Sequence, residues 1–283
     1  MTDPFQELAN AAVSAAIGAV AKEVISPGVS WVRGRFGKQS NIAKREAASN
    51  VDDFLHELVP RIQALEDSSQ ELKKRVDTVA THPDFIVLMQ RTFESAAQTN
   101  RHEKHVLLAE LVSARLQVTD EDMTIARTCD IACEAIAHLT SKQIKLLGLL
   151  YTLNHMQFIP PHQDMGEELI RSLELSWVDA VLGPYSDVHC TPLDRMHLDS
   201  VGCLSAQHGM ILSHSLQSRI ASATSPEFLY DQFRQTPLGI WLFETYEGQR
   251  LNGSELTSTG SLIGMFTADL LASRPTNIYA WEG

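Results

Sequence analysis

The chain has 283 residues, which is enough for two modest domains or for one domain with an appended arm. Hydrophobic residues make up 44% and charged residues 20% of the sequence, so the composition is globular and excludes a disordered chain. The formal net charge is −12, yet residues 1–48 carry six basic side chains against four acidic ones. Residues 146–283 carry six Arg, no Lys and fifteen acids, which argues against nucleic-acid binding by this part.

Three features bear on where the protein works. Asp3 and Glu7 stand where a secretory signal would carry positive charge, and no run of about 18 or more apolar residues is present to span a membrane. The four cysteines are too few for a disulfide framework. We therefore expect a cytoplasmic protein with reduced thiols, peripheral at most to the inner membrane.

The N-terminal stretch ANAAVSAAIGAVAKEVISPGVSWVRGRFGK, residues 9–38, differs in character from the rest of the chain. Residues 8–21 form an uncharged predicted helix, on which Ala11, Ala15 and Gly18 lie on adjacent stripes. Small residues at this spacing allow two helices to approach closely, inside a membrane or in a tight bundle. The spacing therefore predicts a homo-oligomer with these three residues near the contact.

The end of the same stretch is basic. Trp31 is followed by Arg33, Arg35 and Lys38, which is typical of an interfacial anchor: the indole lies at the level of the lipid headgroups and the cations attract anionic lipid. Three interpretations of the arm stay open at this point. It is a membrane-active segment, a helix buried in an oligomer or a core, or a flexible arm.

Residues 49–139 are predicted to be helical throughout. Asn50 is a candidate N-cap of the first helix, Pro83 suits the first turn of another, and Thr119 with Asp122 would open the last. Apolar side chains recur at helical spacing and predict the core: Val51, Phe54, Leu55, Leu58, Ile62 and Leu65, then Leu107, Leu108, Leu111, Val112 and Leu116, then Ile125, Cys129, Ala132, Cys133 and Ile136.

Residues 140–283 contain further predicted helices with distinct start signals. Thr140 and Gln143 form a capping box, in which each side chain satisfies a backbone N–H at the other residue. Thr236 and Thr257 are each followed three residues later by glycine, and a helix is expected to start at each threonine.

The middle of this segment predicts a short helix and then a hairpin. Gly202 is a candidate C-cap for the helix in PLDRMHLDSVGCL, and CLSAQHGMILS alternates apolar and polar residues around Gly209. Helix, helix, helix and a hairpin with a closing ELT segment is the order of a winged-helix unit. The expected fold is mainly α: an Ala-rich N-terminal helical arm at 1–48, a helical domain at 49–139 and a winged-helix-like α+β domain at 140–283.

Several stretches are similar to bacterial families. SKQIKLLGLL, LDRMHLDSVGCL and QTPLGIWLFETY resemble the C-terminal half of the abortive-infection alpha (Abi-alpha) proteins. TFESAAQTNRHEKHVLLAELVSARL and ELTSTGSLIG resemble a neighbouring family of uncharacterised bacterial proteins. The resemblance covers about residues 85–270 and implies a cytoplasmic helical protein linked to phage defence, with no catalytic residues to transfer. The His-rich SDVHCTPLDRMH departs from the pattern.

One set of residues is a weak candidate for a metal site. His189, Cys190, His197 and Cys203 carry suitable side chains, but their spacing is irregular compared with the paired ligands of structural zinc. No metal is therefore expected.

Two other pairs favour structural interpretations. Cys129 and Cys133 lie on the apolar stripe of their predicted helix, so buried packing is favoured over metal binding. His102 and His105 do not form an HExxH motif and are expected on a solvated helix face.

No motif points to an enzyme, and no catalytic residues or cofactors are expected. The sequence has no Gly-x-Ser-x-Gly elbow, no Walker loop and no Gly-x-Gly-x-x-Gly. The leading hypothesis is a non-enzymatic effector of phage defence that acts at the inner membrane through its arm, with itself as a partner and another protein as trigger. The alternative is a non-catalytic module that binds a protein, or less readily DNA, through its winged-helix-like half.

Overall fold

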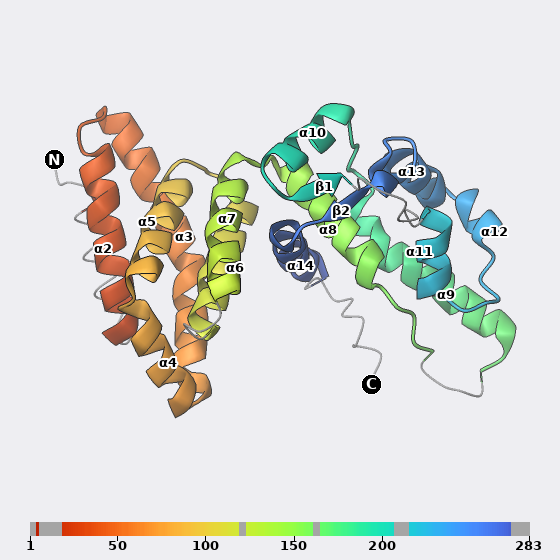
Figure 1. Cartoon of the computed structure of the whole chain (residues 1–283), viewed down its shortest axis with the longest axis horizontal. Coiled ribbons are helices and arrows are strands. Elements are labelled where there is room, and N and C mark those ends of the chain that lie inside the picture. The colour runs from red at the N-terminus through yellow and green to blue at the C-terminus, as the bar shows by residue number, and fades with distance from the viewer. Residues whose placement is uncertain (1–3, 6–18, 119–122, 161–164, 207–214, 273–283) are drawn as a thin grey trace. The chain divides into compact units, whose positions relative to one another are not determined.

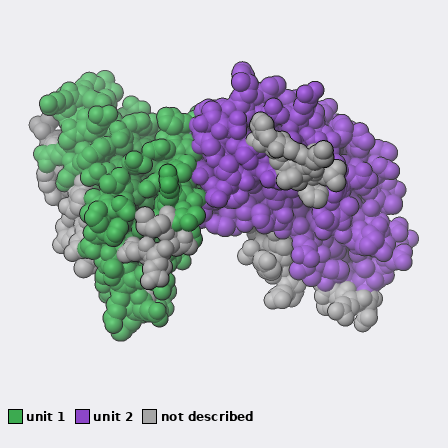
Figure 2. Space-filling model, viewed as in Figure 1, with its two compact units in different colours: residues 1–138 green, residues 139–283 purple. Residues whose placement is uncertain are grey.

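The computed structural model describes residues 4–5, 19–118, 123–160, 165–206 and 215–272. Within these ranges the chain is mainly helical, as expected, and its strands form one two-stranded sheet (Figure 1). The chain divides into two compact units, Met1–His138 and Leu139–Gly283, which Figure 2 shows in different colours and which we name unit 1 and unit 2.

Unit 1 is a bundle of helices that stand side by side (Figure 1). In chain order they are α2 (Ala19–Phe36), α3 (Asn41–Ser68), α4 (Gln70–Ala80), α5 (Pro83–Ala97), α6 (His102–Gln117) and α7 (Met123–His138). α3 packs against α5 and α6, and α2 packs against α5. Phe54 on α3 and Phe93 on α5 meet edge to face in the core, with ring centroids 5.4 Å apart.

The core of unit 1 follows the predicted apolar stripes closely. Every predicted core position is buried except Leu65, which is half-buried, and Ile125, which is exposed. Pro83 lies in the first turn of α5 as predicted. Thr119 and Asp122, predicted to open the last helix, lie outside the described residues.

The prediction that Asn50 is the N-cap of the first helix is wrong. α3 begins at Asn41 and is capped by Ser40, whose hydroxyl accepts a hydrogen bond from the N–H of Ala43 at 3.3 Å. Asn50 is buried within α3, and its side-chain Nδ2 donates to the carbonyl of Ala97 at 3.1 Å. The side-chain amide of Asn50 therefore donates to a carbonyl at the C-terminus of α5. It does not cap a backbone N–H at the start of α3.

α2 contains most of the described part of the predicted arm. The helix continues through Pro27 to Phe36 and buries Ile25, Val29 and Val32, whose spacing places them on one face. α3 then runs without a break through residue 48. The described part of the arm is therefore packed into unit 1.

Unit 2 contains seven helices and both strands of the described chain. The elements are α8 (Ser141–His155), α9 (Glu167–Leu182), α10 (Pro192–Ser200), β1 (Leu204–Ala206), α11 (Leu216–Ala223), α12 (Tyr230–Arg234), α13 (Pro237–Tyr246), β2 (Ser254–Leu256) and α14 (Ser258–Ala272), with 3-10 turns at Gly183–Tyr185 and Leu251–Gly253. α14 packs along α8, the first helix of the unit. A Cβ at Gly264 of α14 would lie 2.7 Å from the carbonyl oxygen of Leu147, so glycine permits this close approach.

The predicted helix starts in unit 2 are confirmed. Thr140 and Gln143 form the capping box at the start of α8. Thr236 accepts a hydrogen bond from the N–H of Gly239 at 3.1 Å, and Thr257 makes the equivalent contact with Gly260 at 3.1 Å. Each threonine therefore satisfies a backbone donor at the beginning of α13 or α14.

The chain turns from α10 into the sheet at Gly202, which has φ +73° and ends α10 as predicted. β1 pairs with β2 in antiparallel register, with Leu204 opposite Leu256. The partner of β1 is thus the ELT segment, which follows three intervening helices. The hairpin predicted around Gly209 lies outside the described residues, so the winged-helix-like arrangement stays a prediction.

Candidate functional site

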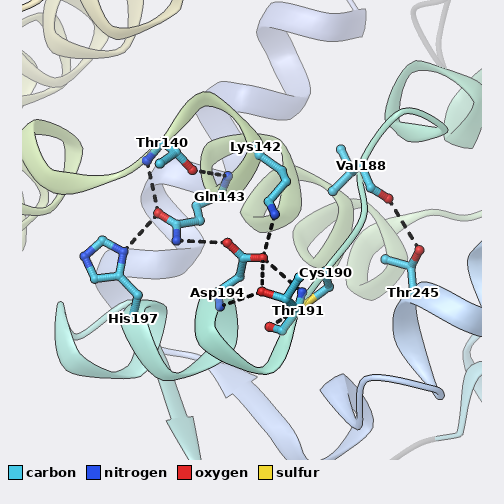
Figure 3. Close-up of polar contacts among 9 residues, drawn as sticks. All are labelled: Thr140, Lys142, Gln143, Val188, Cys190, Thr191, Asp194, His197 and Thr245. Carbon is cyan, nitrogen blue, oxygen red and sulfur yellow. Dashed lines mark hydrogen bonds and ion pairs between the residues drawn. The ribbon is translucent and has the colours of Figure 1, made fainter.

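A network of polar side chains joins the N-terminus of α8 to α10 (Figure 3). Thr191 and Asp194 form a second capping box, which opens α10: Thr191 Oγ1 accepts from the N–H of Asp194 at 3.2 Å, and Asp194 Oδ2 accepts from the N–H of Thr191 at 2.9 Å. This box was not among the predicted helix starts, although the threonine and the acid stand at the required spacing in TPLD.

Asp194 connects the two helix starts. It is buried, its Oδ1 accepts from Gln143 Nε2 at 3.2 Å, and its Oδ2 lies 2.7 Å from Lys142 Nζ. Burial alone would raise the pKa of Asp194, but the hydrogen bonds from Lys142 and Thr191 outweigh burial and hold the pKa below its usual value. Asp194 is therefore a stable carboxylate.

His197 completes the network from α10. Its Nδ1 lies 3.0 Å from Gln143 Oε1, and an amide oxygen only accepts, so the imidazole donates. The same Oε1 accepts from the N–H of Thr140 at 3.0 Å. Because these groups satisfy one another, the network holds α8 against α10.

The four candidate metal ligands do not converge on a metal site. Cys190 and Cys203 are buried, and burial raises their thiol pKa to about 11 and about 12. His197 donates into the network, and His189 is exposed. In the part of the chain that the structure describes, no group of three or more His, Cys, Asp or Glu side chains is arranged to hold a metal ion.

Cys129 and Cys133 pack in the core of unit 1, as the sequence predicted. Both are fully buried, and burial raises the pKa of each thiol to about 11. Cys133 Sγ lies 3.5 Å from the hydroxyl of Thr92. Thiols with raised pKa are poor nucleophiles and poor metal ligands, so their role here is packing.

The expectation of a solvated face is right for His102 and wrong for His105. His102 is exposed, whereas His105 is buried on the same helix. His105 Nε2 lies 2.9 Å from the carbonyl of Thr99 and 3.4 Å from that of Ala96. Since both carbonyls accept, His105 donates to the chain at the C-terminus of α5, where helical carbonyls lack internal partners.

Of the predicted membrane or self-association residues, Ala11, Ala15 and Gly18 lie outside the described residues. Trp31 is described and is half-buried on α2. The predicted homo-oligomer therefore stays a prediction.

The predicted cations Arg33 and Arg35 lie in the last turn of α2, and Lys38 lies in the connection from α2 to α3 at one end of unit 1 (Figure 1). We name the end of α2, the connection and the first turns of α3 the cationic corner, and its members are Arg33, Arg35, Lys38, Ile42, Lys44 and Arg45. Arg35 Nε lies 3.3 Å from Glu94 Oε1 of α5, an exposed ion pair that contributes little to stability. Ile42, in the first turn of α3, is 80% exposed.

The α3 residues of the cationic corner were not predicted from the sequence. Ile42, Lys44 and Arg45 directly follow Ser40, and recognising Ser40 as an N-cap would have placed them on the first turns of a helix. The side chain of Ile42 is exposed, whereas the apolar side chains Ile25, Val29 and Val32 of α2 are buried. None of the helices in the described ranges is both long and apolar enough to cross a membrane.

Comparison with known proteins identifies a family. A family model matches residues 18–239, more than three quarters of the chain, and the family is uncharacterised. Nothing in the match confirms the resemblance to the abortive-infection alpha proteins. No curated protein and no solved structure matches the chain. The chain therefore belongs to this uncharacterised family.

Proposed function

We propose that the protein is a non-enzymatic effector of bacterial phage defence that binds the surface of the inner membrane through the cationic corner. The observation that carries the proposal is the 80% exposure of Ile42 in a stretch of the chain, residues 33–45, that also contains five basic residues. Cations attract anionic headgroups, and an exposed aliphatic side chain can enter the boundary between headgroups and acyl chains. The phage-defence context is what the resemblance to the Abi-alpha proteins implies.

The charge of the corner supports this assignment. Between residues 30 and 46 the sequence has five basic side chains and one acid, Glu46, and Glu94 lies beside Arg35. The surface thus keeps an excess of positive charge in a chain whose formal net charge is −12. Such an excess on one surface of an acidic protein favours an anionic partner.

The packing of α2 changes how the arm would act. Because α2 buries Ile25, Val29 and Val32 in unit 1, membrane contact through the corner needs no release of this helix. Deleting the arm would remove part of the core, so a loss of activity on deletion would not distinguish binding from unfolding. Substitutions of exposed corner residues make the sharper test.

The test measures co-sedimentation of the full-length protein with vesicles of phosphatidylcholine alone and of phosphatidylcholine with phosphatidylglycerol, at low and high salt. We expect binding to the anionic vesicles that weakens with salt. Each Lys or Arg near an anionic surface contributes about 1 kcal/mol, so Lys38→Glu with Arg45→Glu should weaken binding at least roughly thirtyfold.

The matched control is Lys73→Glu with Lys74→Glu on α4, two exposed lysines outside the corner. This control variant changes the net charge by the same amount, and it should bind the anionic vesicles much more tightly than the corner variant does. Equal binding by the two variants, or no preference for anionic vesicles, would refute the membrane proposal. For the phage-defence part, overexpression should slow bacterial growth and the corner variant should relieve the effect; equal toxicity would contradict it.

A second candidate function is a non-catalytic module that binds a protein through the winged-helix-like unit 2. It is favoured by α10, on which Leu193 is 75% and Met196 is 64% exposed, one helical turn apart. Adjacent exposed apolar side chains on one helix are typical of a protein contact. Replacing both with serine would abolish partner binding under this proposal and leave vesicle binding unchanged.

A further inference from the structure

α9 in unit 2 leaves much of its apolar surface uncovered. Only Glu174, Val178 and Leu182 of this helix are buried. Leu169 is 54% exposed, and Leu173 and Trp177, which follow it at four-residue spacing on the same face, are partly exposed. An amphipathic helix normally buries its apolar stripe, whereas this face is only partly covered within the described chain.

The segment before α9 extends this face. The rings of Phe158 and Trp177 meet edge to face with centroids 5.6 Å apart, and Ile159 is 65% exposed. We name the surface the α9 patch, made of Phe158, Ile159, Leu169, Leu173 and Trp177. In Figure 1, one end of α9 lies at the lower right edge of unit 2.

The opposite face of α9 is held in place. Glu174 is fully buried, and its Oε1 accepts from the N–H of Ser225 at 2.7 Å while its Oε2 lies 3.0 Å from the Ser225 hydroxyl. These contacts fix the helix against the turn that follows α11. The α9 patch is therefore preorganised, which lowers the entropic cost of binding a partner.

Charge indicates what kind of partner would cover the patch. α9 carries exposed Glu167, Glu168 and Asp179, and its one basic side chain, Arg171, lies 3.7 Å from Glu167. Residues 146–283 as a whole carry fifteen acids against six arginines. A second copy of unit 2 or an anionic membrane would add like charge, which opposes association, whereas a cationic partner would be attracted.

We propose that the α9 patch binds an amphipathic helix of a partner protein, one whose apolar stripe is flanked by Lys and Arg. Trp177 is the central aromatic anchor, with Leu169 and Leu173 on one side and Ile159 beside Phe158. The acids at the two ends of α9 attract the basic flanks of the incoming helix. The binding mode is that of helix recognition by apolar residues three and four positions apart. This proposal is independent of the cationic corner.

The experiment uses the full-length protein and two fluorescently labelled model peptides of equal length, one an amphipathic helix of Leu and Lys and the other of Leu and Glu. Binding is followed by fluorescence anisotropy. We expect the Leu/Lys peptide to bind about tenfold or more tightly than the Leu/Glu peptide. Ile159→Ser with Leu169→Ser, both exposed, should weaken Leu/Lys binding by about tenfold.

The matched control is Leu193→Ser with Met196→Ser, which removes from α10 a pair of apolar side chains that is even more exposed and should leave peptide binding unchanged. Lys38→Glu with Arg45→Glu should also leave it unchanged, which separates this proposal from membrane binding. Equal affinity for both peptides, or equal loss in the α9 and α10 variants, would overturn the proposal. A dimer in analytical ultracentrifugation that dissociates in the Ile159/Leu169 variant would overturn it in favour of a second copy.

Discussion

Gly28 of α2 lies directly against the ring of Phe93 on α5. A Cβ built at residue 28 would be 2.8 Å from Cζ of that ring, closer than real side chains approach. Phe93 is itself held edge to face against Phe54 of α3. The absence of a side chain at residue 28 thus sets how closely α2 packs against the rest of unit 1.

Gly28→Ala is expected to destabilise the protein by about 1–3 kcal/mol, because the added methyl group overpacks a filled contact. Gly34→Ala on the same helix is the control: a Cβ there meets nothing within 4 Å, and alanine in a helix is favoured over glycine by about 0.5–1 kcal/mol. Chemical denaturation followed by circular dichroism measures both. Equal effects at the two glycines would contradict the close contact.

His105→Leu is expected to destabilise unit 1 by about 1–3 kcal/mol, because it removes the buried imidazole that donates to the carbonyl of Thr99. His102→Ala, three residues earlier on the exposed face of α6, should change the free energy of unfolding by less than about 0.5 kcal/mol. Urea unfolding curves of the two variants give the comparison. A neutral His105→Leu would show that the buried imidazole does not act as a cap.

Asp194→Asn tests the network between α8 and α10 through its pH dependence. The folded pKa of Asp194 is lowered, so its stabilisation is present above the unfolded pKa of about 3.9 and is lost as pH falls through the folded pKa. The variant should be less stable than the wild type by about 1–3 kcal/mol at pH 7, and this difference should shrink as the pH approaches 2.

The control for that series is Asp187→Asn, which removes an exposed carboxylate that lies 2.7 Å from Lys145 Nζ. Surface ion pairs contribute up to about 1 kcal/mol, so this variant should differ less from the wild type. Denaturant unfolding at several pH values measures both. A difference for Asp194→Asn that is independent of pH would rule out the carboxylate as its source.

The four cysteines should be unreactive in the native protein. Burial raises the pKa of the Cys129, Cys133 and Cys190 thiols to about 11 and that of Cys203 to about 12, so the thiolate is scarce near neutral pH. A disulfide exchange reagent at pH 8 should react slowly with folded protein and label four thiols per chain in denaturant. Fast labelling of any thiol in the folded state would contradict this burial.

Local signals predicted local structure well. The capping box at Thr140 and Gln143 and the helix starts at Thr236 and Thr257 were readable because each depends on residues three positions apart. The apolar stripes of unit 1 were readable for the same reason. Helical periodicity reports burial when one face of a helix is covered.

Contacts between distant parts of the chain were not readable. Asn50 is a good N-cap by type, but its partner is the carbonyl of Ala97, and His105 sits among polar residues although the C-terminus of α5 buries it. The ELT segment was predicted to close the hairpin, but no local alternation indicates its pairing with β1 across three further helices. In the cationic corner, Arg33, Arg35 and Lys38 were predicted from the sequence. Ile42 was not, because its exposure depends on where the chain turns from α2 into α3.

The pairing of α8 with α14 has a consequence for how the protein is made. α8 is the first helix of unit 2 and α14 the last, so a nascent chain cannot complete this unit until residues near 272 have left the ribosome. Unit 1 ends at His138 and can fold while the remainder is still being translated. During that interval α8 lacks α14, its packing partner, so its apolar face stays exposed. Chaperones and proteases would therefore act on this chain while unit 2 is incomplete.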